Sequence, residues 1–312
     1  MCYDERHFDT AKELVDFIES NESESFRTAG KFEATTVGRG LHIFRGQSDS
    51  TWEIVPAVFR NLTAPPHPLS DFAAQLPGIY EKTTDKHQWL QSQLHAELWS
   101  VSEFLNTADK LGITTPINYF QTIKAIDSNI YGDKEENSQQ DFPPIAIIEG
   151  IALAQHHGIP TRLIDWTESP LIACFFAAYG ASNLVSDGKR ENSANIAIFC
   201  FNVVTLSRSN KIVQVEAARH RNNFLRQQKG LFTYIPTANS YFIKNGSWPS
   251  LEDIICEENS SGSLKKYTLP SSQADELLRI LFDYDITKHH LMPTLDNIAH
   301  SHRYIKKLWP QF

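Results

Sequence analysis

The sequence contains few residues that build covalent or metal cross-links. Its four cysteines, Cys2, Cys174, Cys200 and Cys256, are widely spaced and form no CxxC pair. Disulfide frameworks and zinc modules use closer, paired spacings, so neither is expected. Cys174 and Cys200 stand in apolar runs and are expected to be buried. We therefore predict reduced thiols in a cytoplasmic protein.

Long apolar runs and an excess of basic residues are also missing. The longest apolar run, "LIACFFAAYGA", is far shorter than the roughly 20 residues that cross a bilayer, and the charged N-terminus lacks the apolar core of a signal peptide. We expect no membrane partner. The net charge of −8 argues against a general nucleic-acid coat but is compatible with a local basic pocket.

The composition is that of an ordinary globular chain. Of 312 residues, 41% are hydrophobic and 21% charged, and neither an internal repeat nor a convincing linker divides the chain. The pattern predicts one α+β domain, in which a small mixed or antiparallel sheet is flanked by helices. We place the motif-bearing core at about residues 38–236, with helical additions at both ends of the single domain 1–312.

Hydrophobic periodicity and turn residues predict the individual elements. Helices are expected at residues 9–21, about 84–111, 145–158, 169–182 and 271–285, and again at the C-terminal end. Strands or extended segments are expected at 35–47, 50–61, 161–167, 196–203 and 224–236. Loops are expected at 62–71, 131–144, 183–195 and 257–264.

Residues 151–167, "IALAQHHGIPTRLIDWT", gather much polar chemistry. Neighbouring histidines on a helix point in different directions, whereas zinc sites on helices use i, i+3 or i, i+4 spacing. His156 and His157 are therefore not expected to bind a metal together. In one alternative, one histidine packs and the other is exposed. In another, His156 or Gln155 faces a pocket at the end of the helix.

The second half of this segment also allows two interpretations. Arg162 and Asp165 would face opposite sides of a strand, but around a turn they would form a structural ion pair. Thr167 and Ser169 precede a helix, so they would either cap it or present hydroxyl groups to a phosphate at its positive end. The residues alone leave these alternatives open.

The sequence "FRGQS" at residues 44–48 presents a similar choice. Arg45 ends a predicted strand, and Gly46 allows close approach of another backbone or a ligand. Arg45 followed by Gly46 and Gln47 fits a phosphate or carboxylate clamp. An arginine that forms a salt bridge at a strand end is the alternative.

Two long blocks resemble the FRG domain family, which takes its name from a Phe-Arg-Gly motif. They are "FRGQSDSTWEIVPAVFR" and "LAQHHGIPTRLIDWTESPLIACFFA". The blocks "RQQKGLF" and "LMPTLDNIAHSHRY" resemble the family's later blocks and follow in the same order. The resemblance implies that residues 151–167 are a family motif rather than a metal site.

A weaker resemblance implies chemistry. Arg45-Gly46 and "DWTESPLIACFFA" are similar to the first two elements of the Arg-Ser-Glu type of ADP-ribosyltransferase, with Thr167 and Ser169 at the hydroxyl positions. The resemblance implies an ADP-ribosyltransferase-like sheet core and NAD as substrate. The third element departs from the pattern, because Gln227 and Gln228 stand where a glutamate is expected.

Cleavage of the glycosidic bond of NAD passes through an oxocarbenium-like transition state, which a carboxylate stabilises. Gln228 can hold a ribose hydroxyl but supplies no charge. Asp165 and Glu168 are the alternative carboxylates. A nucleotide-binding module without turnover is the other interpretation.

Three functions therefore stand as hypotheses. The first is an ADP-ribosyltransferase-like enzyme acting on a nucleic acid or protein acceptor, with a bacterial toxin and a phage-defence effector as the candidate biological roles. The second is a nucleotide-binding module without catalysis, and the third is a nuclease or other hydrolase using Asp165, His156 and Glu168. In the first, the catalytic residues are Arg45, Thr167, Ser169 and Gln228, and the NAD-binding residues are Arg45, Gly46, Gln47, His156, Thr161, Arg162, Asp165 and Trp166.

Overall fold

The computed structural model describes residues 3–20, 42–60, 62, 65–131, 141–186, 194–202, 211–215, 223–258 and 262–311. Seven strands form one mixed sheet in the order β1-β7-β4-β2-β3-β6-β5, in which only β1 and β7 pair in parallel. Their bounds are β1 Asp4–His7, β2 His42–Gln47, β3 Ile164–Thr167, β4 Asn195–Asn202, β5 Val213–Val215, β6 Gly230–Tyr234 and β7 Leu264–Pro270.

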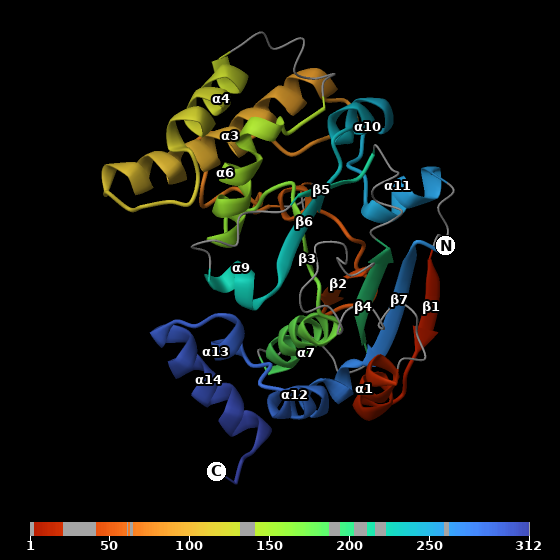
Figure 1. Ribbon diagram of the computed structural model, residues 1–312. Helices are drawn as coiled ribbons and strands as arrows, with labels where there is room; N and C mark the ends of the chain where they lie inside the picture. The colour runs from red at the N-terminus through yellow and green to blue at the C-terminus, as the bar shows by residue number, and fades with distance from the viewer. Residues whose placement is uncertain are drawn as a thin grey trace, which may run out of the picture.

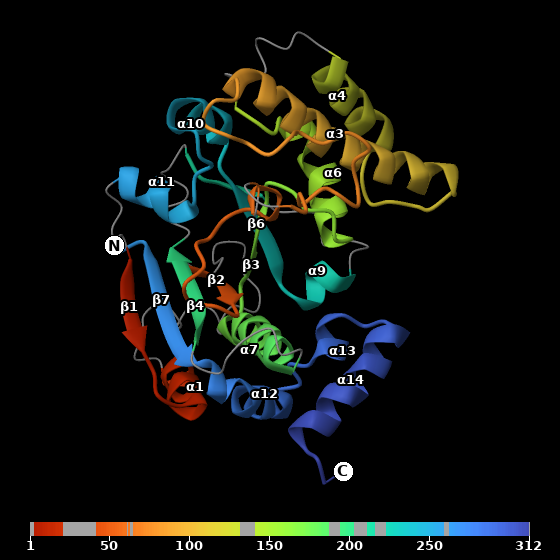
Figure 2. The same ribbon diagram turned by 180° about the vertical axis from the view of Figure 1, so that it is seen from behind.

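Helices cover both faces of this sheet (Figures 1 and 2). One group, α3, α4 and α6, lies above the sheet in Figure 1, and a second group, α1, α7 and α12, lies below it. The bounds are α1 Ala11–Glu19, α3 Lys86–Lys110, α4 Tyr119–Tyr131, α6 Ile145–His156, α7 Pro170–Ser186, α9 Asn223–Gln227, α10 Ala238–Asn245, α11 Leu251–Glu257, α12 Ala274–Asp283, α13 Lys288–Leu291 and α14 Leu295–Leu308.

Strand β4 shows how the sequence produces these layers. Successive side chains of a strand point to opposite faces, so a strand covered on both sides is apolar throughout. Ile196, Ile198 and Cys200 pack into the core that includes α7 and α12, whereas Phe199 and Phe201 pack into the core that includes α3 and α6. The predicted buried strand at 196–203 is confirmed as far as Asn202.

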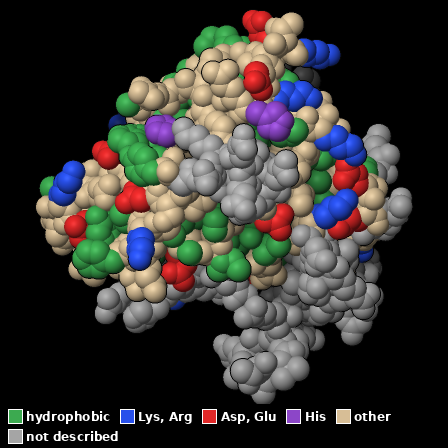
Figure 3. All heavy atoms as spheres, turned by 90° about the horizontal axis from the view of Figure 1, so that it is seen from above, with side chains coloured by type: hydrophobic (Ala, Val, Ile, Leu, Met, Phe, Trp, Pro, Cys, Tyr) green, Lys and Arg blue, Asp and Glu red, His purple; other side chains and the backbone are tan. Residues whose placement is uncertain are grey.

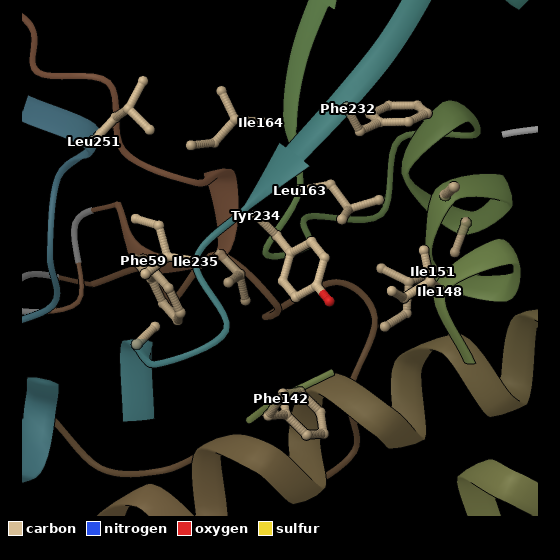
Figure 4. Packing of buried hydrophobic residues seen from close by; sticks show 14 of the residues in the cluster. Phe59, Phe142, Ile148, Ile151, Leu163, Ile164, Phe232, Tyr234, Ile235 and Leu251 are labelled. Carbon is tan, nitrogen blue, oxygen red and sulfur yellow. The ribbon is translucent and has the colours of Figure 1, made fainter. Parts of the chain in front are cut away.

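The upper core joins the sheet to α6 (Figure 4). Tyr234 of β6 lies between Ile148 and Ile151 of α6 on one side and Phe59 on the other. All four side chains are at least nine-tenths buried. Such burial contributes about 1.5–3 kcal/mol per large apolar side chain. The C-terminal end of α6 is therefore held firmly against the sheet.

Most predicted helices are confirmed. Thr10 caps α1 in a reciprocal arrangement with Glu13, and the Asp85 side chain accepts hydrogen bonds from two backbone N–H groups at the start of α3. Gly158 follows α6 with a φ of +94°, a conformation that glycine adopts without strain. Pro170 is the first residue of α7, as its position after Ser169 predicts.

Several boundaries differ from the prediction. Residues 50–61 form no strand over their described part; a short 3-10 helix, Ala57–Phe59, follows Pro56, which has no N–H to give to a sheet. In 224–236, the helix α9 and a turn at Lys229 precede β6. Helix α7 continues to Ser186, and α12 begins at Ala274 after a 3-10 turn.

Other elements were not predicted at all: β1, β5, β7, α4, α10 and α11. The prediction of buried thiols is confirmed for Cys174 and Cys200. The prediction is wrong for Cys256, which is disulfide-bonded. Cys2, residues 35–41, and the predicted loop residues 132–140, 187–193 and 259–261 lie outside the described part of the chain.

The face seen from above carries a mixed surface (Figure 3). Among its coloured side chains, basic and acidic groups are interspersed with hydrophobic ones rather than gathered by sign. A polyanion coat needs a continuous basic surface, which this face does not offer in its coloured part. Within the described ranges, every helix is too short or too polar to pass through a bilayer.

Candidate functional site

The sheet is weakly joined between β2 and β3. These strands pair at one position, Phe44 opposite Thr167, whereas β2 pairs with β4 along its whole length and β3 with β6 likewise. A pocket of about 540 Å³ lies at this point. Its lining comes from β2, β3, α6, α7, the turn before β6, and α13–α14: Phe44, Arg45, Gly46, Gln155, His156, His157, Asp165, Trp166, Thr167, Ala173, Phe176, Gln228, Met292 and Asn297.

The pocket brings together seven of the residues predicted for the site, and four others do not line it. The seven are Arg45, Gly46, His156, Asp165, Trp166, Thr167 and Gln228, and the four are Gln47, Thr161, Arg162 and Ser169. The alternative in which His156 or Gln155 faces a pocket at the end of its helix matches the structure for both residues.

Arg45 and Asp165 form the charged centre of the pocket. Arg45 Nη1 donates a hydrogen bond to the backbone oxygen of Asp165 at 2.8 Å and lies 3.8 Å from its carboxylate Oδ2. The Arg45 side chain is 13% exposed and that of Asp165 is 63% exposed. Arg45 Nε is buried and has no hydrogen-bond partner among the described residues. Burial lowers the pKa of Arg45, and the negative charges of Asp165 and Glu252 oppose this only in part.

A second arginine stands near this centre. Arg60 follows the 3-10 helix, and its Nε donates to the backbone oxygen of Val55 at 3.1 Å. Burial, followed by the positive charge of Arg45, lowers the pKa of Arg60 to about 10, although Asp165 raises it. Arg60 itself is exposed and is not among the residues that line the pocket, so it adds positive charge near Arg45 rather than a contact within the pocket.

The hydroxyl group of Thr167 is used locally. Its Oγ1 donates to the backbone oxygen of Gln228 at 2.7 Å and accepts from the backbone N–H of Ser169 at 3.1 Å. The hydroxyl thus closes the turn before α7, which begins at Pro170, and these bonds show neither of the two predicted roles, capping the helix or facing a ligand. Gln228 is half-buried in the pocket, where its Nε2 donates to the backbone oxygen of Leu291 at 3.4 Å.

The two histidines follow each other at the end of α6. His156 is half-buried, and His157 is exposed with its ring 5.6 Å from that of Phe104. Burial lowers the pKa of His156, the neighbouring His157 lowers it further, and Asp165 opposes the change. A neutral imidazole in the pocket is therefore favoured near neutral pH.

Gly46 has a packing role that its sequence context only partly indicated. A Cβ atom at this position would lie 1.9 Å from the Ala173 backbone oxygen and 2.8 Å from the Ala177 nitrogen. The backbone that approaches Gly46 is therefore that of α7. Gln47 is buried beside it, and its Nε2 donates to the backbone oxygen of Glu53 at 3.4 Å.

Arg162 does not pair with Asp165 and is 3% exposed in the core. Its Nε lies 2.5 Å from Glu97 Oε2 on α3, and its Nη1 donates to Asn239 on α10 at 2.6 Å. The Phe59, Phe142 and Trp248 rings lie within about 5 Å of the guanidinium carbon. These contacts make Arg162 a tie between the helices above the sheet and the start of β3.

Six pocket residues were not predicted for the site: Phe44, His157, Ala173, Phe176, Met292 and Asn297. Met292 and Asn297 belong to the block "LMPTLDNIAHSHRY", so a signal was present in the sequence. Trp166, which was predicted, lines the pocket, but its ring nitrogen is bonded to Thr233 Oγ1 at 2.8 Å. Over the described ranges, no group of three His, Cys, Asp or Glu residues could hold a metal ion.

The structure is that of a mixed α/β protein with a pocket where strands β2 and β3 of the sheet meet. Residues 41–184 match the model of the FRG domain, which supports the FRG family. The match contains β2, β3, α6 and α7 and ends before the segments that contribute Gln228, Met292 and Asn297. No curated protein and no solved structure matches the chain.

Proposed function

We propose that the pocket binds NAD and transfers its ADP-ribose group to an acceptor, in the manner of an ADP-ribosyltransferase. The observation that carries the proposal is the pairing of Arg45 with Asp165 in one pocket. The arginine is suited to a phosphate group, and the carboxylate is suited to a cationic transition state.

Arg45 has donors to spare for a phosphate. A guanidinium group carries five N–H donors. The described residues accept one hydrogen bond from Arg45, and its buried Nε has no partner. A buried donor left unsatisfied costs about 1–3 kcal/mol. Because Nε is out of solvent contact while the side chain as a whole is 13% exposed, a phosphate would bind through the remaining N–H donors.

Asp165 is the only acidic residue among the described residues that line the pocket; Glu168 is not one of them. In the proposed reaction, the bond between ribose C1′ and the nicotinamide nitrogen breaks, and nicotinamide leaves with the bonding electron pair. The acceptor hydroxyl, amine or water then forms a bond to C1′ and loses a proton. Asp165 stabilises the positive charge on the ribose, and the Gln228 amide holds a ribose hydroxyl.

The pocket has a suitable size and a suitable mixture of surfaces. Its volume of about 540 Å³ lies in the usual range for small-molecule sites, about 300–1,000 Å³. Phe44, Phe176 and Met292 provide apolar contacts opposite the polar residues. This combination supports a ligand with a flat ring and a charged group, as NAD has.

Nicotinamide release from NAD tests the proposal, with and without cell lysate as a source of acceptors. We expect Arg45→Ala and Asp165→Asn each to reduce release at least about 100-fold, the size of effect typical for one electrostatic group. Glu168→Gln, a matched carboxylate change outside the pocket lining, should retain release. Equal activity of the wild type and Asp165→Asn would contradict the role of Asp165.

Binding without turnover is the second candidate. Gln155 and Arg45 both engage Asp165, and an amide, Gln228, stands where the sequence resemblance to ADP-ribosyltransferases would place a glutamate. This candidate predicts saturable, Arg45-dependent binding of NAD in calorimetry, with no nicotinamide released.

A further inference from the structure

The ion pair between Arg45 and Asp165 is held short of full contact. Strong arginine–carboxylate pairs place nitrogen and oxygen about 2.7–2.9 Å apart, often through two parallel bonds. Here Arg45 Nη1 lies 3.8 Å from Asp165 Oδ2, although the same nitrogen lies 2.8 Å from the backbone oxygen of Asp165. The backbone thus anchors the arginine while the carboxylate stays back.

Gln155 is the group that holds the carboxylate. Its Nε2 donates to Asp165 Oδ1 at 2.7 Å from the last turn of α6. Its Oε1 accepts a hydrogen bond from the hydroxyl of Thr161, a buried residue that does not line the pocket. Gln155 therefore bridges Thr161 and Asp165, because both its Oε1 and its Nε2 form a hydrogen bond.

The direction of these bonds is fixed by the carboxylate of Asp165, which accepts from Gln155 and therefore requires the N–H side of the amide group. The Oε1 of Gln155 is then directed to Thr161, whose hydroxyl donates to it. The Leu163 N–H donates to Thr161 Oγ1 at 3.1 Å and holds that hydroxyl in place. This run from Leu163 through Thr161 and Gln155 to Asp165 is called the relay below.

We propose that the relay keeps Arg45 open for an anionic ligand by holding the Asp165 carboxylate away from it, which makes Gln155 and Thr161 positioning residues. Without the relay, Asp165 would close on Arg45 and occupy the donors that a phosphate needs. The inference rests on the part of the proposed function in which Arg45 binds a phosphate group. It extends to any ligand with a phosphate or diphosphate.

The surrounding charges agree with an open arginine. Burial lowers the pKa of Arg45 more than Asp165 and Glu252 raise it, so its positive charge is incompletely compensated. Arg60 adds a second positive charge nearby. A bound anion would supply the missing negative charge. The Asp165 carboxylate would supply it instead if it moved into full contact with Arg45. The ligand and the carboxylate thus compete for the same guanidinium group.

The test measures the affinity of the full-length protein for inorganic pyrophosphate by calorimetry. Gln155→Leu removes the donor to Asp165 and should weaken binding about tenfold or more. Asp165→Asn removes the competing charge, so the double variant Gln155→Leu/Asp165→Asn should regain the affinity of Asp165→Asn alone. Thr161→Val should weaken binding, and Thr161→Ser, which keeps the hydroxyl, should not. Thermal unfolding of each variant checks the fold.

Three results would overturn the inference: unchanged affinity in Gln155→Leu, a double variant as weak as Gln155→Leu, or no pyrophosphate binding by the wild type. The proposed function fails separately. A protein that shows the relay-dependent affinity but neither binds nor cleaves NAD would retain the inference and lose the proposed function. If the protein releases nicotinamide from NAD but its pyrophosphate affinity does not change in Gln155→Leu, the proposed function is retained and the inference is lost.

Discussion

Gly46 is the residue at which α7 and β2 come closest. A methyl group there would lie 1.9 Å from a backbone oxygen of α7, and a backbone atom cannot rotate away as a side chain can. Overpacking of a core costs about 1–3 kcal/mol and more where the neighbours are rigid. We expect Gly46→Ala to lower the free energy of unfolding by about 3 kcal/mol or more, measured in urea.

Gly78→Ala is the matched control for this change, because a Cβ at Gly78 meets no heavy atom within 4 Å. It should alter the free energy of unfolding by less than about 1 kcal/mol. A Gly46→Ala variant as stable as Gly78→Ala would show that α7 does not pack on β2 as described. The glycine of the Phe-Arg-Gly motif is thereby explained by packing rather than by a ligand.

Arg45 and Arg162 show what the sequence can and cannot say about single residues. Both stand in motifs next to polar and apolar residues, and both were predicted for the pocket. The structure separates them, because Arg162 is paired with Glu97 and Asn239, which are distant in sequence. Local spacing holds no information on such partners, whereas a buried arginine always requires them.

At the scale of elements, the sequence predicts those helices and strands whose own residues show a periodic apolar pattern or a cap. Helices α1, α3, α6 and α7 and strand β4 each present a clear apolar pattern or a cap. Strand β1 presents neither, since all four of its residues, "DERH", are exposed, and it exists because β7 offers a free edge. Such an element is defined by its neighbour, and its own residues cannot predict it.

The pocket residues also divide into those that their own sequence context predicts and those that only the fold brings to the site. Arg45, Asp165 and Thr167 could be predicted because they stand in short strands inside long motifs, although Thr167 alone of the three ends its strand and Arg45 does not end β2 as predicted. Met292 and Asn297 reach the pocket only because the C-terminal helices fold back beside α7 and α9 (Figure 1). The family resemblance pointed to their block, but nothing in its periodicity predicts that position.

Helix α11 brings a carboxylate with an unusual pKa next to the segment that follows β2. Glu252, in the first turn of α11, accepts the Ile54 N–H at 3.0 Å. Burial raises its pKa from 4.5 to about 7, although the hydrogen bonds to backbone N–H groups oppose the change. The folded protein thus holds this proton more tightly than the unfolded chain. Its contribution to stability is present below pH 4.5 and is lost as the pH rises through about 7.

We expect Glu252→Gln to remove this loss. Measured by thermal unfolding, the variant should gain stability relative to the wild type between pH 5 and pH 8, by about 1–3 kcal/mol at the upper end. Glu257→Gln, on the same helix but exposed, is the control and should follow the wild type. A constant difference between Glu252→Gln and the wild type across this range would contradict the raised pKa.

At the scale of the whole molecule, the sheet connects distant parts of the chain. Strand β2 lies between β3 and β4, and β3 pairs along its length with β6. Helix α7 packs against β2 and β4 and also meets α12. The described pocket lining comes from strands β2 and β3 of this sheet and from the helices and turns next to them. The site is therefore a property of the complete fold, and its lining residues run from Phe44 to Asn297 in the sequence.

The segment that matches the FRG domain should consequently not fold alone. Residues 41–184 contain only two of the described strands, and these pair at a single position. The apolar faces that Ile43 and Phe44 bury against β4 and its neighbours would be open to water, at about 25 cal/mol per Å² of apolar surface. We expect the isolated segment 41–184 to show neither a cooperative thermal transition nor dispersed amide signals in NMR, in contrast to the full chain. A sharp transition in the segment would mean that the pairing of β2 with β4 is dispensable, and the pocket would then have to be rebuilt from the matched residues alone.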